Sequence, residues 1–301
     1  MNNWKLFVSS FLLMILLIIV FAGAHLPFVD TDLKETGVIK TEEGQFLLPP
    51  FPPMEGYLLG SNHKGIDILS LIILGAKETL LIVISVVILR YIVAIPLAIG
   101  GFYSKFVENV LKIWQQLFSF MPPIFFVAFF VTLPIMFFAE NRGLWVIAVL
   151  ALLEAGRIAE IILDHMQETE KRPYIEAGIV AGGTQLRMFR NYYLPVVIPH
   201  IIILIINDMG RVLFLLAQLG IVHIYVTHKF ITLESGAYEV VNSSLAWPTM
   251  FETITRDIFS YEWIPFSVIA AITLTIFTFN LFADGMQRFF EIKYRTIRND
   301  L

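Results

Sequence analysis

Residues 171–195 read KRPYIEAGIVAGGTQLRMFRNYYLP and lie between two long apolar stretches of the chain. Pro173 suits the first turn of a helix, because an N–H at that position would have no partner within the helix. Gly182 and Gly183 are residues at which helices commonly end, and Thr184 is a favourable N-cap for a second helix. The stretch therefore predicts two short crossing helices that form a compact knob. Composition alone leaves open an ordinary loop with a glycine-rich turn.

The chain as a whole has the composition of a membrane protein. Of its 301 residues, 57% are hydrophobic and 15% are charged, whereas an ordinary soluble domain has about 25% charged residues. These figures exclude a disordered or collagen-like chain, and the lack of cysteine excludes a disulfide-rich scaffold. The net charge of −4 gives no electrostatic reason to bind nucleic acid. We expect a lipid bilayer as the main surroundings and no nucleic-acid partner.

Hydrophobic stretches long enough to cross a bilayer recur along the chain. A crossing helix needs about 20 mostly apolar residues. We therefore expect an all-α membrane protein with six transmembrane helices at about 6–24, 79–102, 117–139, 143–162, 192–222 and 264–282. The first stretch is longer than the apolar region of a signal peptide, which favours a retained helix over a cleaved signal. Segment 66–76 is too short to cross alone and is expected as an interfacial helix.

Prolines and basic residues add detail to this topology. Pro96, Pro122-Pro123 and Pro134 predict kinks in the second and third crossings. Basic residues concentrate in the segments on the side of the termini, which predicts that both termini are cytoplasmic. We divide the chain into a first helix with an extracytoplasmic segment, a core of five further crossings containing a cytoplasmic loop at about 163–191, and a cytoplasmic tail. The corresponding ranges are 1–66, 67–290 and 291–301.

Several ionisable residues fall inside the expected crossings, where they are costly unless they pair or meet water. Asp208 and Arg211 are three residues apart and fit one face of a helix, as do Glu154 and Arg157. Arg90 has no partner nearby in the sequence, so its partner is expected elsewhere in the protein or on another chain. These residues either line a polar path through the membrane or form ion pairs that fix helix packing. The path candidates are Arg90, Asn207, Asp208 and Arg211.

Sequence patterns for metal binding or catalysis do not emerge. His63 and His200 have no second ligand at a suitable spacing, so we expect no metal site, and His63 is expected to be solvated. The sequence has no phosphate-binding loop of the form G-x-x-x-x-G-K-[ST] and no Ser-His-Asp or HExxH pattern. One function that the charged residues leave open is that of an intramembrane enzyme, whose polar site would be built from Glu154, Arg157, His200 and Asp208. A secondary transporter is disfavoured because no inverted repeat is visible.

The order of residues in the knob resembles the cytoplasmic signature of ABC importer permeases. That signature is Glu-Ala-Ala, three residues, Gly, nine residues, then a hydrophobic residue, any residue and Leu-Pro. Here Glu176-Ala177-Gly178 is followed at the same spacing by Gly182 and by Tyr192-Tyr193-Leu194-Pro195. Gly178 stands where the family has Ala, and Tyr192 stands at the aliphatic position. The resemblance implies that this segment is a coupling helix seated in a separate ATPase subunit. The residues implied are Tyr174, Ile175, Glu176, Ala177, Gly178, Gly182, Gly183, Leu194 and Pro195.

Two more segments resemble the dipeptide, oligopeptide and nickel branch of these permeases, in its second (C-type) subunit. Residues 59–77 are similar to its Gly-Thr-Asp…Gly-Arg-Asp…Ser-Arg…Gly-Ala-Arg stretch, although Ile66 and Leu71 stand where that branch has Arg. Residues 279–285, FNLFADG, are similar to its closing motif. Trp247-Pro248 lies where the branch often has a Ser-Trp-Gly element.

The resemblance implies a type I ABC importer permease in a bacterial cytoplasmic membrane. It implies peptides as the solute, with nickel or another small solute as the alternative. The implied partners are a second, homologous permease in a heterodimer, two ATPase subunits and an extracytoplasmic solute-binding protein. The chain itself is expected to bind no cofactor and to catalyse no reaction, because ATP and Mg²⁺ are used by the ATPase subunits.

Overall fold

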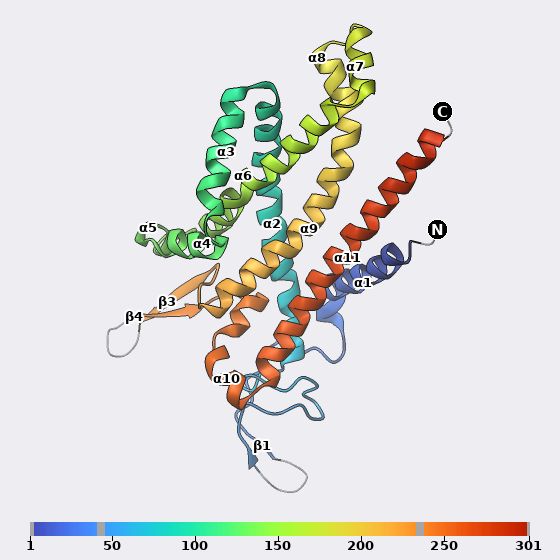
Figure 1. Ribbon diagram of the computed structural model, residues 1–301. Coiled ribbons are helices and arrows are strands. Elements are labelled where there is room, and N and C mark those ends of the chain that lie inside the picture. The colour runs from blue at the N-terminus through green and yellow to red at the C-terminus, as the bar shows by residue number, and fades with distance from the viewer. Residues whose placement is uncertain (1–2, 41–45, 233–237, 300–301) are drawn as a thin grey trace. The chain divides into compact units, whose positions relative to one another are not determined.

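The computed structural model describes residues 3–40, 46–232 and 238–299, and most of them are helical (Figure 1). The long helices are α1 (Trp4–Ala22), α2 (Ile68–Tyr103), α6 (Arg142–Glu170), α9 (Leu194–Ile221) and α11 (Trp263–Asn299). The shorter ones are α3 (Lys105–Ser119), α4 (Pro123–Thr132), α5 (Pro134–Phe137), α7 (Pro173–Val180), α8 (Gln185–Met188) and α10 (Ile254–Ser260). A π-helical turn, Phe189–Tyr193, joins α8 to α9, and 3₁₀ turns occur at Gly23–His25 and Trp247–Phe251.

Two small antiparallel hairpins complete the described secondary structure. Strand β1 (Ile39–Lys40) pairs with β2 (Phe46–Leu47), with Ile39 opposite Leu47. Strand β3 (His228–Thr232) pairs with β4 (Tyr238–Asn242), with His228 opposite Asn242. The hairpins are too short to form a sheet core, so the prediction of a predominantly helical protein is confirmed.

Four helical segments in the described residues are long and apolar enough to cross a membrane: Trp4–His25, Ile68–Tyr103, Gln185–Ile221 and Trp263–Lys293. A fifth crossing results if α3 and α4 are counted as one bent span. Helix α6 covers the expected fourth crossing but carries Glu154, Arg157 and Glu160 within it. The protein is therefore a multi-pass membrane protein.

The expected third crossing, 117–139, is not one kinked helix. Helix α3 ends at Ser119, α4 begins at Pro123, and the two are bent by 88°. Pro122 has an extended backbone with ψ 137°, because the ring of the following Pro123 disfavours the helical region for the residue before it. Leu133 before Pro134 is extended in the same way, with ψ 138°. The prolines break this segment rather than bend it.

The expected interfacial helix at 66–76 is also corrected, because it is the beginning of α2. The Asp67 carboxylate accepts hydrogen bonds from the Ser70 backbone N–H at 2.8 Å and from the Ser70 hydroxyl at 2.7 Å. This cap starts the helix at Ile68. The helix then continues past Pro96 to Tyr103.

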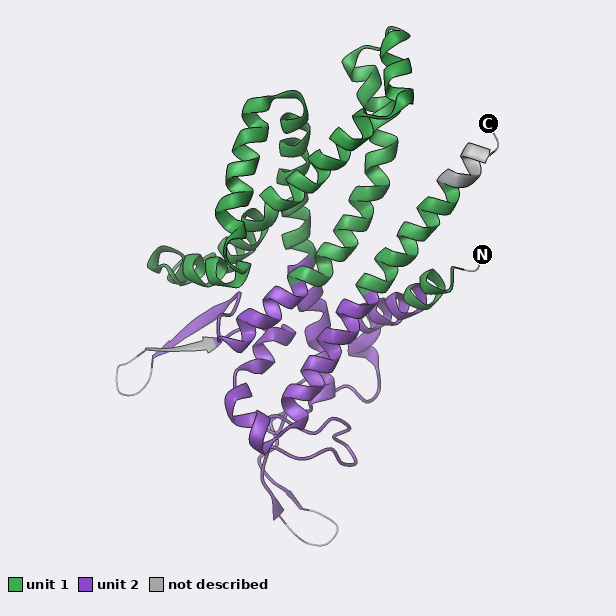
Figure 2. Ribbon diagram, in the orientation of Figure 1, with its two compact units in different colours: residues 1–9, 84–212, 279–301 green, residues 10–83, 213–278 purple. Residues whose placement is uncertain are grey.

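The chain forms two compact units, each made of separate stretches (Figure 2). Unit 1 comprises 1–9, 84–212 and 279–301, and unit 2 comprises 10–83 and 213–278. In unit 1, helices α3, α4 and α5 pack against α6. Gly156 of α6 faces Trp114 of α3 so closely that a Cβ at this glycine would lie 2.8 Å from the indole ring. The fully buried apolar side chains of this unit include Leu111, Leu150, Ile158, Ile162, Leu163, Met166 and Ile175.

Candidate functional site

The knob has the two helices that the sequence predicts, and the end of the first is fixed by glycine. Helix α7 begins at Pro173, and Gly182 has a left-handed backbone with φ 78°. The Gly183 N–H donates to the Gly178 carbonyl at 3.1 Å, and the Gly182 N–H donates to the Ile179 carbonyl at 2.9 Å. This pair of bonds is the Schellman arrangement, which satisfies carbonyls left free at a helix end. Thr184 precedes α8 as expected, but its side chain makes no capping hydrogen bond.

The knob has its own small hydrophobic core. Ile175, Met188 and Tyr193 are buried together, with Tyr192 and Phe102 packed around them. The Tyr193 and Phe102 rings meet edge to face with centroids 5.1 Å apart. Helices α7 and α8 and the π-helical turn are therefore held to one another and to the end of α2.

Gly178 permits the close contact of α7 with the segment that follows it. A Cβ at Gly178 would lie 3.0 Å from the Met188 sulfur and 3.1 Å from Cζ of Tyr192. A Cβ at Gly183 would lie 2.7 Å from the same sulfur. Gly178 and Gly183 thus face the interior of the knob. Leu194 is half-buried, while Pro195, Glu176 and Ala177 are exposed.

The outer surface of the knob is apolar. Val180 and Leu186 have 85% and 78% of their surface exposed, and Ile179 and Tyr174 are also exposed. These side chains come from both α7 and α8, the two short helices labelled beside the end of α6 in Figure 1. Exposed apolar patches mark interaction sites. The surface of the knob is suited to contact with another protein.

A second feature of unit 1 is a closed network of four charged residues from three helices. Arg90 of α2 donates through Nη1 to both oxygens of Asp208 of α9, each at 2.8 Å. Arg157 of α6 donates through Nη2 to Glu154 at 2.7 Å and to Asp208 at 3.3 Å. Glu154 lies 3.6 Å from Nη1 of Arg90 and completes the ring. We call Arg90, Asp208, Arg157 and Glu154 the charge network.

Burial divides the charge network into an inner and an outer pair. The side chains of Arg90 and Asp208 are each 1% exposed, while those of Glu154 and Arg157 are 16% and 26% exposed. Arg90 also donates through Nη2 to the Leu150 carbonyl at 2.6 Å. The inner pair therefore ties α2, α6 and α9 together, and only the outer pair reaches accessible space.

The sequence identified these charged residues but not their pairing. In the described part of the chain, Asp208 forms its ion pairs with Arg90 and Arg157, not with Arg211 along its own helix. Arg211 is exposed and Asn207 is half-buried, so these two path candidates lie outside the network. The partner of Arg90 is on this chain. Arg90 and Asp208 are 118 residues apart, so helix spacing rules cannot predict that they pair.

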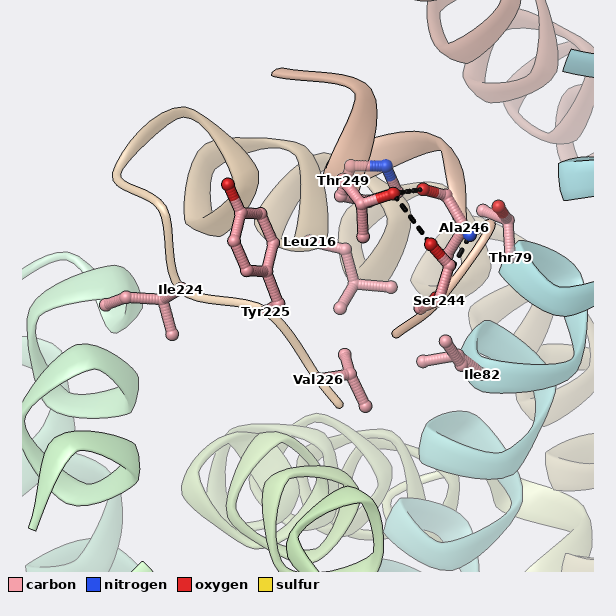
Figure 3. Close-up of a pocket in the computed structure, with 10 residues that line it drawn as sticks. Thr79, Ile82, Leu216, Ile224, Tyr225, Val226, Ser244, Ala246 and Thr249 are labelled. Atoms are coloured by element: carbon pink, nitrogen blue, oxygen red, sulfur yellow. Dashed lines mark hydrogen bonds between the residues drawn. The ribbon is translucent and has the colours of Figure 1, made fainter. Parts of the chain in front are cut away.

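Unit 2 brings the beginning of α2 together with the loop at 244–249, and Figure 3 shows Thr79 of α2 beside Ser244 and Ala246. Glu78 accepts hydrogen bonds from the Ser244 hydroxyl at 2.7 Å and the Leu245 N–H at 2.8 Å. The Trp247 N–H donates to the Thr79 hydroxyl at 2.9 Å, and a Cβ at Gly75 would lie 2.2 Å from the Leu245 carbonyl oxygen. A cavity of about 10 Å³, large enough for one water molecule, lies beside Thr79 and Ser244. Gly75 therefore allows the loop at 244–249 to lie directly on α2.

His63 is not a solvated side chain, and that expectation is corrected. Its Nε2 lies 2.6 Å from Oδ1 of Asp257, which is 1% exposed. Asp257 also accepts a hydrogen bond from the Thr253 hydroxyl, and the His63 ring packs edge to face on Tyr261. Because His63 and Asp257 are 194 residues apart, only the tertiary structure reveals this pair.

The closing motif at 279–285 holds the beginning of α1 within unit 1. Lys5 forms an ion pair with Asp284 at 2.7 Å, and the Asn3 side chain donates to the Gly285 carbonyl at 2.8 Å. A Cβ at Gly285 would lie 2.8 Å from Cα of Leu6. The last two residues of the motif therefore dock the first helix against α11.

A protein-family model described as "Binding-protein-dependent transport system inner membrane component" matches residues 90–296. The matched range includes the knob and the whole charge network. Members of this family are transport permeases rather than enzymes, and they operate in ABC importers with ATPase and binding-protein partners. The intramembrane-enzyme alternative is therefore set aside. With its knob, its apolar helices and this match, the chain belongs to the family of binding-protein-dependent transport system inner membrane components.

Proposed function

We propose that this chain is the permease subunit through which an ABC importer moves di- or oligopeptides. The knob is the observation that carries the assignment as a permease subunit, while the resemblance of residues 59–77 and 279–285 to the peptide and nickel branch supports the solute. The core of the knob holds α7 and α8 together, while Val180 of α7 and Leu186 of α8 remain exposed on its surface. An ATPase subunit that covers this apolar surface would transmit its movement through Phe102 to α2 and through the π-helical turn to α9.

The proposal includes the complete assembly. The chain crosses the bacterial cytoplasmic membrane six times with both termini in the cytoplasm, counting α6 and the bent α3–α4 pair as crossings. It pairs with a second, homologous permease, and two ATPase subunits bind the cytoplasmic knobs. An extracytoplasmic binding protein delivers the solute. ATP and Mg²⁺ are bound by the ATPase subunits and not by this chain.

The expected mechanism is alternating access. Closure of the ATPase subunits moves the knob, and the knob moves the helices that border the path. Helices α2, α6 and α9 are held together by the charge network, so they would move as a group. Arg90, Asn207, Asp208 and Arg211 are the sequence-derived candidates for the path. The burial of Arg90 and Asp208 favours a supporting role for these two residues.

Substitutions in the knob test this proposal. Glu176→Lys reverses an exposed charge on α7, and Gly182→Trp forces a bulky side chain into a left-handed backbone position. In the reconstituted complex, both variants should reach the membrane in normal amounts but lose ATP-driven uptake of a labelled peptide. Glu291→Lys is the charge-reversal control on the exposed end of α11, and Gly37→Trp is the control at a glycine with open space around it.

The outcomes separate the parts of the proposal. Normal peptide uptake by both knob variants would contradict coupling through the knob. Uptake of nickel rather than peptide by the wild-type complex would support the role as a permease and contradict the assignment of peptides as the solute. The chain has no native cysteine, so a single cysteine at Val180 can be crosslinked to the ATPase. Absence of any such crosslink during turnover would exclude the contact.

A further inference from the structure

A cavity in unit 1 lies against the outer pair of the charge network. Its volume is about 410 Å³, within the range of small-molecule sites. The end of α3, the bend before α4 and the middle of α6 form its walls. Its polar lining consists of Gln115, Ser119, Glu154 and Arg157, and its apolar lining includes Phe118 and Phe120.

The outer pair presents one charge of each sign to this cavity. Glu154 and Arg157 are joined at 2.7 Å, and both retain accessible surface, unlike Arg90 and Asp208 behind them. Ionisable side chains within a membrane protein usually face its interior or a water-filled cavity, since lipid cannot solvate them. The polar groups of Gln115 and Ser119 on the same wall are suited to the neutral hydrogen-bonding groups of a solute.

Each member of the outer pair has a second partner in the network. Arg157 lies 3.3 Å from Asp208, and Glu154 lies 3.6 Å from Arg90. When the outer pair separates, neither charge loses all of its compensation. An isolated buried ion pair lacks this property, because separation would leave two uncompensated charges. The arrangement therefore lets the outer pair exchange its mutual bond for bonds to a solute.

We propose that Glu154 and Arg157 form a binding subsite for solutes that carry both an ammonium and a carboxylate group. The solute carboxylate binds the Arg157 guanidinium, which offers several N–H donors in a fork that matches a carboxylate. The solute ammonium binds Glu154. The inner pair, Arg90 and Asp208, positions the two binding residues. The subsite deepens the proposed function, on which its assignment to transported solute rests, and it specifies small peptides with free termini.

Cysteine labelling tests the subsite without requiring transport. Ser119→Cys places a single thiol on the cavity wall of a chain that otherwise has none. In membranes containing the full complex, a charged methanethiosulfonate reagent should modify this thiol. Dialanine at ten times its dissociation constant should slow the modification about tenfold, because about a tenth of the sites remain free. N-acetyl-dialanine amide, which has neither charge, should give no protection.

Variants identify which residue binds which terminus. In the Ser119→Cys background, Arg157→Gln should abolish the advantage of dialanine over dialanine amide, which lacks the carboxylate. Glu154→Gln should abolish the advantage of dialanine over N-acetyl-dialanine, which lacks the ammonium. Lys112→Gln is the matched control, because it removes a charge from α3 that pairs with Glu108 and does not line the cavity.

Three results would overturn the subsite. They are a thiol that no reagent modifies, equal protection by dialanine and its doubly blocked derivative, and protection that neither variant changes. Each of these can occur while the knob variants still uncouple transport, which would leave the proposed function intact. Conversely, the knob variants could transport normally while dialanine still protects the thiol selectively. That result would support the subsite and contradict coupling through the knob.

Discussion

Gly178 and Tyr192 occupy one contact inside the knob, where a Cβ on the glycine would lie 3.1 Å from Cζ of the tyrosine ring. These are the two positions at which the knob differs from the signature of ABC importer permeases. The smaller residue on α7 makes room for the larger one before α9. The Tyr192 ring also stacks on Tyr174, with centroids 6.5 Å apart. The two departures therefore compensate each other and preserve the packing of the knob.

This compensation predicts coupling between the two positions. Gly178→Leu should disturb the knob strongly, because Met188 and Tyr192 both lie within 3.1 Å of the added Cβ. Gly178→Ala should cause a smaller loss, and Tyr192→Leu should relieve it. A double-mutant cycle on ATP-driven uptake measures the interaction. Strictly additive effects of Gly178→Ala and Tyr192→Leu would contradict the contact.

The left-handed backbone of Gly182 makes a separate prediction. Gly182→Ala should destabilise the end of α7 by about 1 kcal/mol or more, because φ is 78° and a Cβ is strained there. Gly182→Asn should cost less, since asparagine tolerates this conformation better. Apart from its two chain neighbours, no atom of the described residues lies within 4 Å of a Cβ at this position, so the difference reports backbone strain. Proteolysis of the knob in membranes measures it, and equal cleavage of both variants would refute the explanation.

The inner pair of the charge network should be important for stability. Arg90→Met leaves the buried Asp208 without its two 2.8 Å bonds, and breaking a buried pair costs about 3–5 kcal/mol. The double variant Arg90→Met/Asp208→Leu should lose less than the sum of the single variants. Thermal unfolding in detergent measures this, with Lys112→Met at a half-exposed pair as the control. A melting temperature unchanged in Arg90→Met would exclude the predicted contribution.

The His63–Asp257 pair should hold the segment before α2 to α10. His63→Ala leaves a carboxylate that is 1% exposed with a weaker set of partners, and an unsatisfied buried group costs about 1–3 kcal/mol. Hydrogen exchange should therefore increase at residues 60–67. His63→Gln should restore part of the protection, because its amide can donate to the same carboxylate. Unchanged exchange in His63→Ala would show that the pair does not hold this segment.

Close packing at Gly75 predicts a defect in unit 2. Gly75→Ala would place a Cβ 2.2 Å from the Leu245 carbonyl oxygen, which is backbone and cannot rotate away. The loop at 244–249 must then move off α2, and its hydrogen bonds to Glu78 and Thr79 should weaken. Gly100→Ala is the control in the same helix, where the nearest atom would lie 3.4 Å away. The melting temperature in detergent should fall for Gly75→Ala and remain close to wild type for Gly100→Ala.

Local features of this protein can be predicted from the amino-acid sequence. The runs of apolar residues identify a membrane protein, and the order Pro173, Gly182, Thr184 identifies two short helices and the turn between them. These features depend on residues that are close together in the chain, so periodicity and capping rules can predict them. Pro122-Pro123 predicts a kink in the third crossing. Whether the helix bends there or ends depends on the packing of neighbouring helices, which local sequence rules do not describe.

The pairing of polar residues that are distant in the sequence depends on how the helices pack. Asp208 fits Arg211 by helix spacing, yet it pairs with Arg90 because α2 and α9 bury both side chains against α6. His63 likewise pairs with Asp257 because the fold of unit 2 brings the two residues together. A buried charge requires compensation from whichever element packs against it, and the identity of that element is a property of the fold. The outer pair and the cavity beside it follow from the same packing.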